Sequence, residues 1–201
     1  MHDPSESTLV NQPKTNRGQE TLNRICSAAE EIFFEKGYYQ TGINDITGLA
    51  NVSAGTFYIY FESKQNLYEY LLRQYSHTIR LHISQAIAGC KTRREAEREG
   101  LRAWLNFIAE HKYVFNITWE SLFIDKRLFD EYYSTFARSY IKHLNNAKLT
   151  GEVKDIDPEV LSFALMGLAN FIGMHWIMFK EERDIDYIVN EAMKMLDGMF
   201  N

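Results

Sequence analysis

Residues 41–64 constrain the fold of this chain more than any other stretch. Within it, residues 43–50 place apolar side chains on one side of a short helix. Asn51 and Val52 predict a tight corner, after which the Ser53 hydroxyl can cap a second short helix. Two short helices joined in this way form a helix-turn-helix, whose second helix fits the major groove of B-DNA. The pattern alone leaves a DNA-binding motif and a generic helical corner both open.

The second short helix, expected at about residues 54–60, carries two kinds of side chain. Phe57 and Phe61 recur at the spacing of a helix face that is turned toward a core. The side chains that fall off this face, and would meet solvent or a partner, are Thr56, Tyr58 and Tyr60.

Charge argues mildly against DNA binding. The formal net charge of the 201 residues is −5, and residues 1–75 hold six Lys and Arg against nine Asp and Glu. A site-specific protein can nevertheless place a few donors on one face while its carboxylates lie elsewhere. The balance therefore predicts weak nonspecific binding with a modest dependence on salt.

Cysteine usage and hydropathy favour the cytoplasm. With only Cys26 and Cys90, neither a disulfide nor a metal pair is expected. The N-terminal residues lack an apolar core of secretory length. The most apolar run, residues 163–179, is slightly short for a membrane span and contains Asn170 and His175, which favours a buried helix.

The rest of the chain also predicts helices, and with them an all-α fold. The first helix is expected at about residues 19–36, and a long one runs from Ser63 to about residue 88. Thr92 is expected to cap the helix that follows, and Asp157, with proline after it, to cap another. The remaining expected helices span about residues 126–149 and 184–199.

The N-terminal region matches a known pattern without a gap. The matching positions are Ala28, Ala29, Ile32, Phe33, Lys36, Gly37, Tyr38, Thr41, Ile43, Asp45, Ile46, Ala50, Val52, Ser53, Gly55, Thr56, Phe57, Tyr58, Tyr60, Phe61, Ser63, Lys64 and Leu67. Over residues 17–67 the chain resembles the N-terminal domain of TetR-family (tetracycline-repressor-like) transcriptional regulators. The resemblance implies a homodimer that binds a palindromic operator, usually as a repressor. Neither catalytic residues nor a cofactor is expected.

The resemblance also implies which residues contact DNA. The residues transferred in this way are Thr41, Ser53, Ala54, Gly55, Thr56, Tyr58, Tyr60 and Lys64. Thr41 is expected to cap the first helix of the motif next to a phosphate, and Lys64 to bind a phosphate. Two departures from the family matter, since Gly42 lacks a common hydroxyl and Ala54 offers only a methyl group for base reading.

We expect three parts: a flexible arm (1–16), a DNA-binding domain (17–63), and a ligand-binding and dimerisation domain (64–201). The third part is unusually aromatic. An aromatic stripe is more often core than ligand site, but bulky rings in a helical bundle leave voids that suit an apolar ligand. The residues expected to bind the effector are Trp104, Phe107, Phe115, Trp119, Phe123, Tyr133, Phe136, Tyr140, Phe171 and His175.

Effector class stays open at this point. An amphipathic aromatic compound and an acyl thioester both fit, with cationic drugs third; Glu120 and Asp125 could favour a cation. The last two expected helices hold six of the seven methionines, and we expect this pair to form a four-helix dimer interface, as in the family. No metal-binding His/Cys cluster, phosphate-binding glycine loop or nucleophile motif is present in the sequence. The alternative is a helical ligand carrier or enzyme with an incidental helix-turn-helix.

Overall fold

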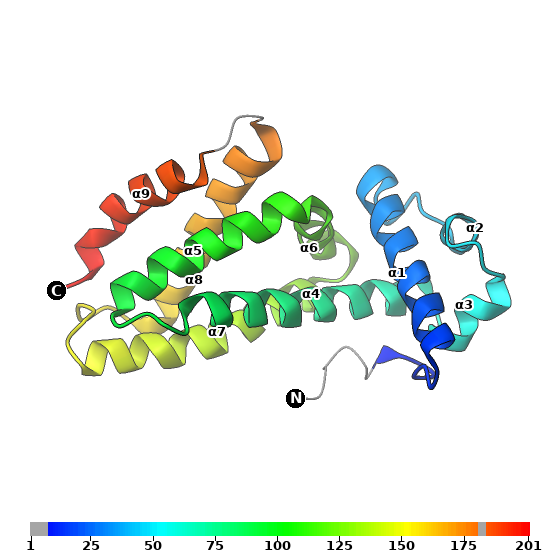
Figure 1. Ribbon diagram of the computed structural model, residues 1–201, viewed down its shortest axis with the longest axis horizontal. Helices are drawn as coiled ribbons and strands as arrows, with labels where there is room; N and C mark the ends of the chain where they lie inside the picture. The colour runs from blue at the N-terminus through cyan, green and yellow to red at the C-terminus, as the bar shows by residue number, and fades with distance from the viewer. Residues whose placement is uncertain (1–7, 181–183) are drawn as a thin grey trace. The chain divides into compact units, whose positions relative to one another are not determined.

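The computed structural model describes residues 8–180 and 184–201 (Figure 1). Within these ranges the regular elements are helices, with one isolated bridge between Val153 and Phe200, so the predicted all-α class is confirmed. The elements in order are α1 (Asn16–Lys36), α2 (Ile43–Leu49), α3 (Ala54–Tyr60), α4 (Lys64–Ile87), α5 (Arg93–Glu110), α6 (Lys112–Ile124), α7 (Lys126–Leu149), α8 (Pro158–Gly173), the π-helical η2 (Met174–Phe179), α9 (Ile185–Leu196) and the 3₁₀ turn η3 (Asp197–Met199).

Contacts between residues divide the chain into two units. The first contains the chain up to His77 together with Tyr113–Tyr132, and the second contains Thr78–Lys112 and Tyr133–Asn201. Helix α6 therefore belongs with the helix-turn-helix, a grouping that the sequence did not predict. The expected boundary between residues 63 and 64 divides a DNA-binding domain from a ligand-binding and dimerisation domain. This division by function stays a prediction.

The core of the first unit is built from aromatic and branched side chains that the helical spacing brings to one side. Ile25 and Ala29 of α1 are completely buried, as are Phe57 and Phe61 around α3. The Phe57 and Phe61 rings lie 5.6 Å apart, at a distance where aromatic pairs add to the gain from burial. The predicted inward face of the second motif helix is confirmed.

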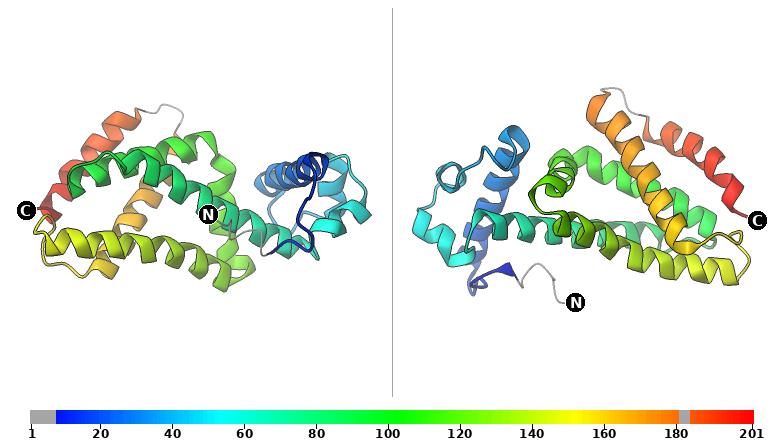
Figure 2. Two further views of the ribbon diagram at one scale, coloured as in Figure 1. Left: turned by 60° about the horizontal axis from the view of Figure 1, so that its bottom comes forward. Right: turned by 180° about the vertical axis from the view of Figure 1, so that it is seen from behind.

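The second unit packs α5 against both α8 and α9 (Figure 1 and Figure 2). Thr92 caps α5 by accepting the Glu95 N–H at 3.1 Å, as the sequence predicted. The core between α7, α8 and the C-terminal end consists of Leu144, Ala147, Val153, Leu161, Leu165 and Met199.

Helix α8 and η2 correct one expectation. Together they span Pro158–Phe179, a helix that by length and composition alone could cross a membrane. The sequence predicted a buried helix here, yet only 28% of its most apolar stretch is buried in the single chain. Phe171 is 62% exposed and Phe179 is 76% exposed. Much of the apolar run is therefore exposed in the single chain.

Candidate nucleic-acid interface

A left-handed residue makes the corner between α2 and α3. Asn51 has φ of +52°, a conformation that asparagine tolerates better than most residues. The Val52 N–H donates to the Thr47 carbonyl at 3.0 Å and closes the turn. Ser53 then accepts the Thr56 N–H at 3.1 Å and begins α3, as predicted. Local sequence thus fixes both the corner and the start of the second motif helix.

Four of the eight predicted DNA contacts lie on the outer surface of α3. Ser53, Ala54 and Gly55 are exposed, and the Tyr58 side chain is 51% exposed. A Cβ atom added at Gly55 would meet no heavy atom closer than the Ser53 Oγ, at 3.7 Å. The backbone at Gly55 is therefore open to an approaching partner, and the ring of Tyr58 stands one turn further along the same surface.

Two other predicted contacts are buried. Thr41 is only 2% exposed, and its hydroxyl donates to the Gly37 carbonyl at 2.7 Å. The residue that caps α2 is Gly42, so the predicted capping role of Thr41 is wrong. Tyr60 is 7% exposed and donates to the Gly18 carbonyl at 3.1 Å, so the prediction that its side chain falls off the core face is wrong. Both hydroxyls join parts of the domain to each other, and their phosphate contacts stay predictions.

Lys64 lies half-buried against the connection between α1 and α2. Its ammonium donates to the carbonyls of Tyr38 and Thr41 at 2.6 Å each, and it lies 4.1 Å from the centre of the Tyr38 ring. Burial lowers the pKa of Lys64, and the nearby Glu120 carboxylate opposes that shift. The ammonium has a third donor, so contact with a phosphate stays a prediction beside this structural role.

Helix α6 is hydrogen-bonded to the same connection. The Glu120 carboxylate accepts the Tyr38 N–H at 2.8 Å, and the Tyr39 hydroxyl donates to the Phe123 carbonyl at 2.9 Å. Gly37 has φ of +77°, and a Cβ atom there would lie 2.9 Å from the Glu120 Oε1. The sequence suggested that Glu120 could favour a cationic ligand, but this contact shows that the carboxylate holds a backbone amide. Nothing in the local sequence signals a partner 82 residues away.

Lys64→Met should destabilise the first unit. The methionine keeps the apolar stem but leaves the two carbonyls without their donor, which costs about 1–3 kcal/mol. Chemical unfolding followed by circular dichroism measures the difference, with Lys126→Met as a control at an exposed lysine. Equal stability of Lys64→Met and the wild type would show that the two short contacts contribute nothing.

The residues predicted to bind an effector fall in both units. In the first, Phe115 and Trp119 stack with ring centres 6.1 Å apart, and Phe123 is 75% exposed. The members in the second are Trp104, Phe107, Tyr133, Phe136, Tyr140, Phe171 and His175. His175 is exposed rather than a core residue. The expected effector site over these ten residues stays a prediction.

Two tyrosines of the expected effector site already have partners. The Tyr133 hydroxyl donates to the Asn170 side chain at 3.2 Å. The Tyr140 hydroxyl donates to Glu97, which also pairs with Arg93 at 2.7 Å. Burial raises the pKa of Glu97, while Arg93 and the Tyr140 hydrogen bond oppose that shift. The Tyr140 hydroxyl therefore satisfies a buried carboxylate, and its ring alone could face a ligand.

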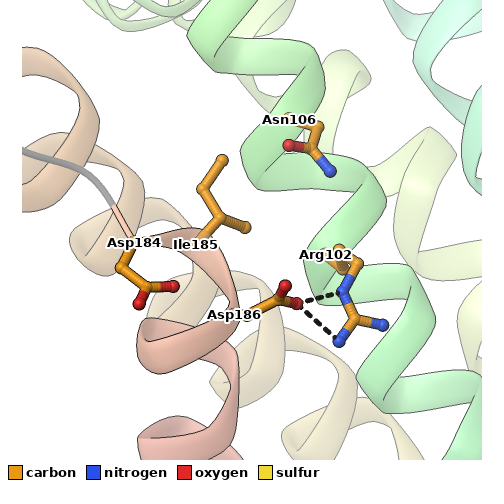
Figure 3. Close-up of a pocket in the computed structure, with 5 residues that line it drawn as sticks. All are labelled: Arg102, Asn106, Asp184, Ile185 and Asp186. Atoms are coloured by element: carbon orange, nitrogen blue, oxygen red, sulfur yellow. Dashed lines mark hydrogen bonds and ion pairs between the residues drawn. The ribbon is translucent and has the colours of Figure 1, made fainter.

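A pocket of about 530 Å³ lies where α5 meets the start of α9 (Figure 3). Its walls come from Arg102, Asn106, Asp184, Ile185 and Asp186, none of which was predicted to bind a ligand. The Arg102 guanidinium donates to Asp186 at 2.9 Å (Figure 3). It also pairs with Glu99. The lining therefore holds one guanidinium against two carboxylates, those of Asp184 and Asp186.

Comparison with known proteins places this motif in a family. Residues 25–71 match the model described as "Bacterial regulatory proteins, tetR family". The uncharacterized HTH-type transcriptional regulator YhgD of Bacillus subtilis is 26% identical over 156 residues, covering 76% of this chain and 82% of YhgD.

Solved structures share the fold over most of the chain. The fatty acid degradation regulator FadR from Bacillus halodurans superposes with a TM-score of 0.80 at 18% identity, covering 92% of this chain and 96% of that one. FadR from Bacillus subtilis, solved in complex with stearoyl-CoA, superposes with a TM-score of 0.78 at 20% identity, covering 87% of this chain and 96% of that one. The helix-turn-helix region, residues 25–71, is therefore that of the tetR family of bacterial regulatory proteins, and most of the chain shares the fold of solved regulators.

Proposed function

We propose that this regulator is a homodimeric repressor that binds a palindromic operator and releases it when a hydrophobic effector binds. The observation that carries DNA binding is the outer surface of α3. There Ser53, Ala54, Gly55 and Tyr58 are exposed while Phe57, on the opposite side, is completely buried. A short helix held by its inner face and open along its outer face suits entry into a major groove.

The apolar surface of the last two helices supports a dimer. On α8, Val160 is 65% exposed and Phe171 is 62% exposed; on α9, Tyr187 is 55% and Met195 62% exposed. Large apolar side chains exposed in this way are costly in water, and an exposed apolar patch marks an interaction site. A twofold contact between copies would cover it and would present two α3 helices to the two halves of a palindrome.

For the effector we propose an apolar or aromatic molecule, and an acyl thioester as the class to test first. Two observations support this choice. FadR from Bacillus subtilis, which shares the fold, was solved in complex with stearoyl-CoA. The ten residues expected at the effector site include nine aromatic side chains besides His175, and aromatic surface suits a long apolar chain.

Release of DNA requires the effector to bind the DNA-incompetent state more tightly, by about 1.4 kcal/mol for each tenfold loss of operator affinity. Helix α6 offers a route for this coupling. Its Phe115 and Trp119 belong to the expected effector site, while its Glu120 holds the Tyr38 amide next to Lys64. A displacement of α6 would therefore act directly on the connection that precedes α2.

Footprinting on the DNA upstream of the protein's own gene tests the proposal. We expect protection of a palindrome, and its loss when stearoyl-CoA, but not coenzyme A alone, is added. Mass spectrometry after gentle purification would show whether the protein retains a different apolar compound. Protection that no acyl-CoA and no retained compound relieves would contradict the effector class, and absence of any protected site would contradict DNA binding there.

A further inference from the structure

The segment before α1 contacts the C-terminal end of α3. The Val10 N–H donates to the Tyr60 carbonyl at 2.9 Å, and the Asn11 side-chain amide donates to the Ile59 carbonyl at 2.8 Å. The sequence predicted a flexible arm over residues 1–16, of which residues 1–7 lie outside the described part. For Val10 and Asn11 these two hydrogen bonds correct that prediction.

Helix α3 needs such partners because it is short. It has seven residues, and an isolated helix of this length is unstable in water. Its last four carbonyls have no donor further along the helix itself. Phe61 supplies a donor to the Phe57 carbonyl at 3.0 Å, and Asn11 and Val10 supply donors to the carbonyls of Ile59 and Tyr60. The arm therefore satisfies backbone carbonyls at the end of α3, as the Ser53 hydroxyl satisfies a backbone N–H at its start.

The arm is also fixed where it meets α1. Thr15 accepts the Gly18 N–H at 3.1 Å and caps that helix. A Cβ atom on Gly18 would lie 3.3 Å from the Pro13 Cβ, so this segment runs close against the first turn of α1. The Gly18 carbonyl in turn accepts the Tyr60 hydroxyl. Residues 10–18 thus form a strap that joins the end of α3 to the start of α1.

We infer that Val10 and Asn11 are positioning residues for DNA recognition: they hold the end of α3, and operator affinity depends on them without their touching the DNA. The inference rests on the proposed function, since it concerns the helix whose exposed face, with Tyr58, would read the operator. It differs from a direct electrostatic role, in which basic residues near the start of α1, such as Lys14 and Arg17, would bind phosphates themselves.

Val10→Pro tests the backbone bond most sharply, because proline removes the N–H that Tyr60 accepts. Val10→Ala keeps the N–H and is its matched control. Asn11→Ala removes the second donor, with Asn16→Ala as its control at an exposed asparagine. Each variant is measured for operator affinity and, without DNA, for hydrogen exchange of the amides of residues 57–61.

We expect Val10→Pro and Asn11→Ala to weaken operator binding by about two- to tenfold, the value of one hydrogen bond, and to accelerate exchange in α3. Both controls should behave as the wild type. Unchanged affinity in Val10→Pro and Asn11→Ala would overturn the inference. So would weaker binding with unchanged exchange, which would mean that the arm acts by contacting DNA. If the wild type binds no operator, the proposed function fails. Unchanged hydrogen exchange in both variants would then show that Val10 and Asn11 do not hold the end of α3.

Discussion

Gly55→Glu should reduce operator affinity by at least about 100-fold while leaving the protein folded. The change places a carboxylate on the outer surface of α3, where the proposed interface meets phosphates and base edges. Repulsion and the loss of close backbone approach together should exceed about 2.7 kcal/mol, which is a 100-fold change. The fold should tolerate the side chain because its Cβ meets no heavy atom closer than 3.7 Å. An acidic residue in the first turn of a helix is also favourable.

Gly55→Ala separates folding from binding in the same experiment. Alanine in place of glycine within a helix should stabilise it by about 0.5–1 kcal/mol. If the backbone at residue 55 lies against DNA, operator affinity should fall while thermal stability rises. Fluorescence anisotropy with labelled operator and a thermal melt measure the two quantities. Wild-type affinity in Gly55→Glu would mean that α3 does not enter the groove by this face.

Phe171→Glu should convert the dimer into a monomer. The side chain is 62% exposed in the single chain, so the substitution should leave the subunit folded but place a charge inside the proposed apolar interface. A monomer reads only half of a palindrome, and losing the second linked site should cost about 10²–10⁴ in operator affinity. Sedimentation at micromolar concentration and operator titration measure the two effects.

Phe123→Glu is the matched control for the dimer prediction. This phenylalanine is 75% exposed but belongs to α6, outside the proposed interface. It should sediment as the wild type does. A wild-type protein that sediments as a monomer, or a Phe171→Glu variant that stays dimeric with full affinity, would contradict an interface on α8.

Local signals in the sequence predicted the elements well. Ser53, Thr92 and Asp157 cap the helices expected after them, because capping depends on backbone groups only two or three residues away. The burial of Phe57 and Phe61 also followed from local sequence, because their spacing places both side chains on one face of the helix. The family resemblance over residues 17–67 is confirmed by the match over residues 25–71.

Partners distant along the chain could not be predicted. Thr41, Tyr60 and Lys64 are residue types that suit phosphate contacts, yet their polar groups bond to carbonyls in the first unit. Spacing gave no sign of this, since a hydroxyl or an ammonium serves a carbonyl as well as a phosphate. The candidate face on α3 is accordingly narrower than the sequence implied.

The exposure of α8 could not be predicted from the spacing of its apolar residues. The apolar residues of α8 match the pattern of a core helix, and periodicity cannot tell a core from an interface between copies. The aromatic residues expected to line one effector site are divided between two units for a related reason. Composition shows that rings are abundant, but the packing of α6 beside the helix-turn-helix decides which of them meet.

Selection from a pool of random DNA duplexes tests the central claim most directly, because it needs neither a known operator nor a known effector. The wild-type protein should enrich a palindromic sequence with two half-sites, and Gly55→Glu should enrich none. If the wild type enriches no sequence, or Gly55→Glu enriches the same one, the outer surface of α3 is not what recognises DNA.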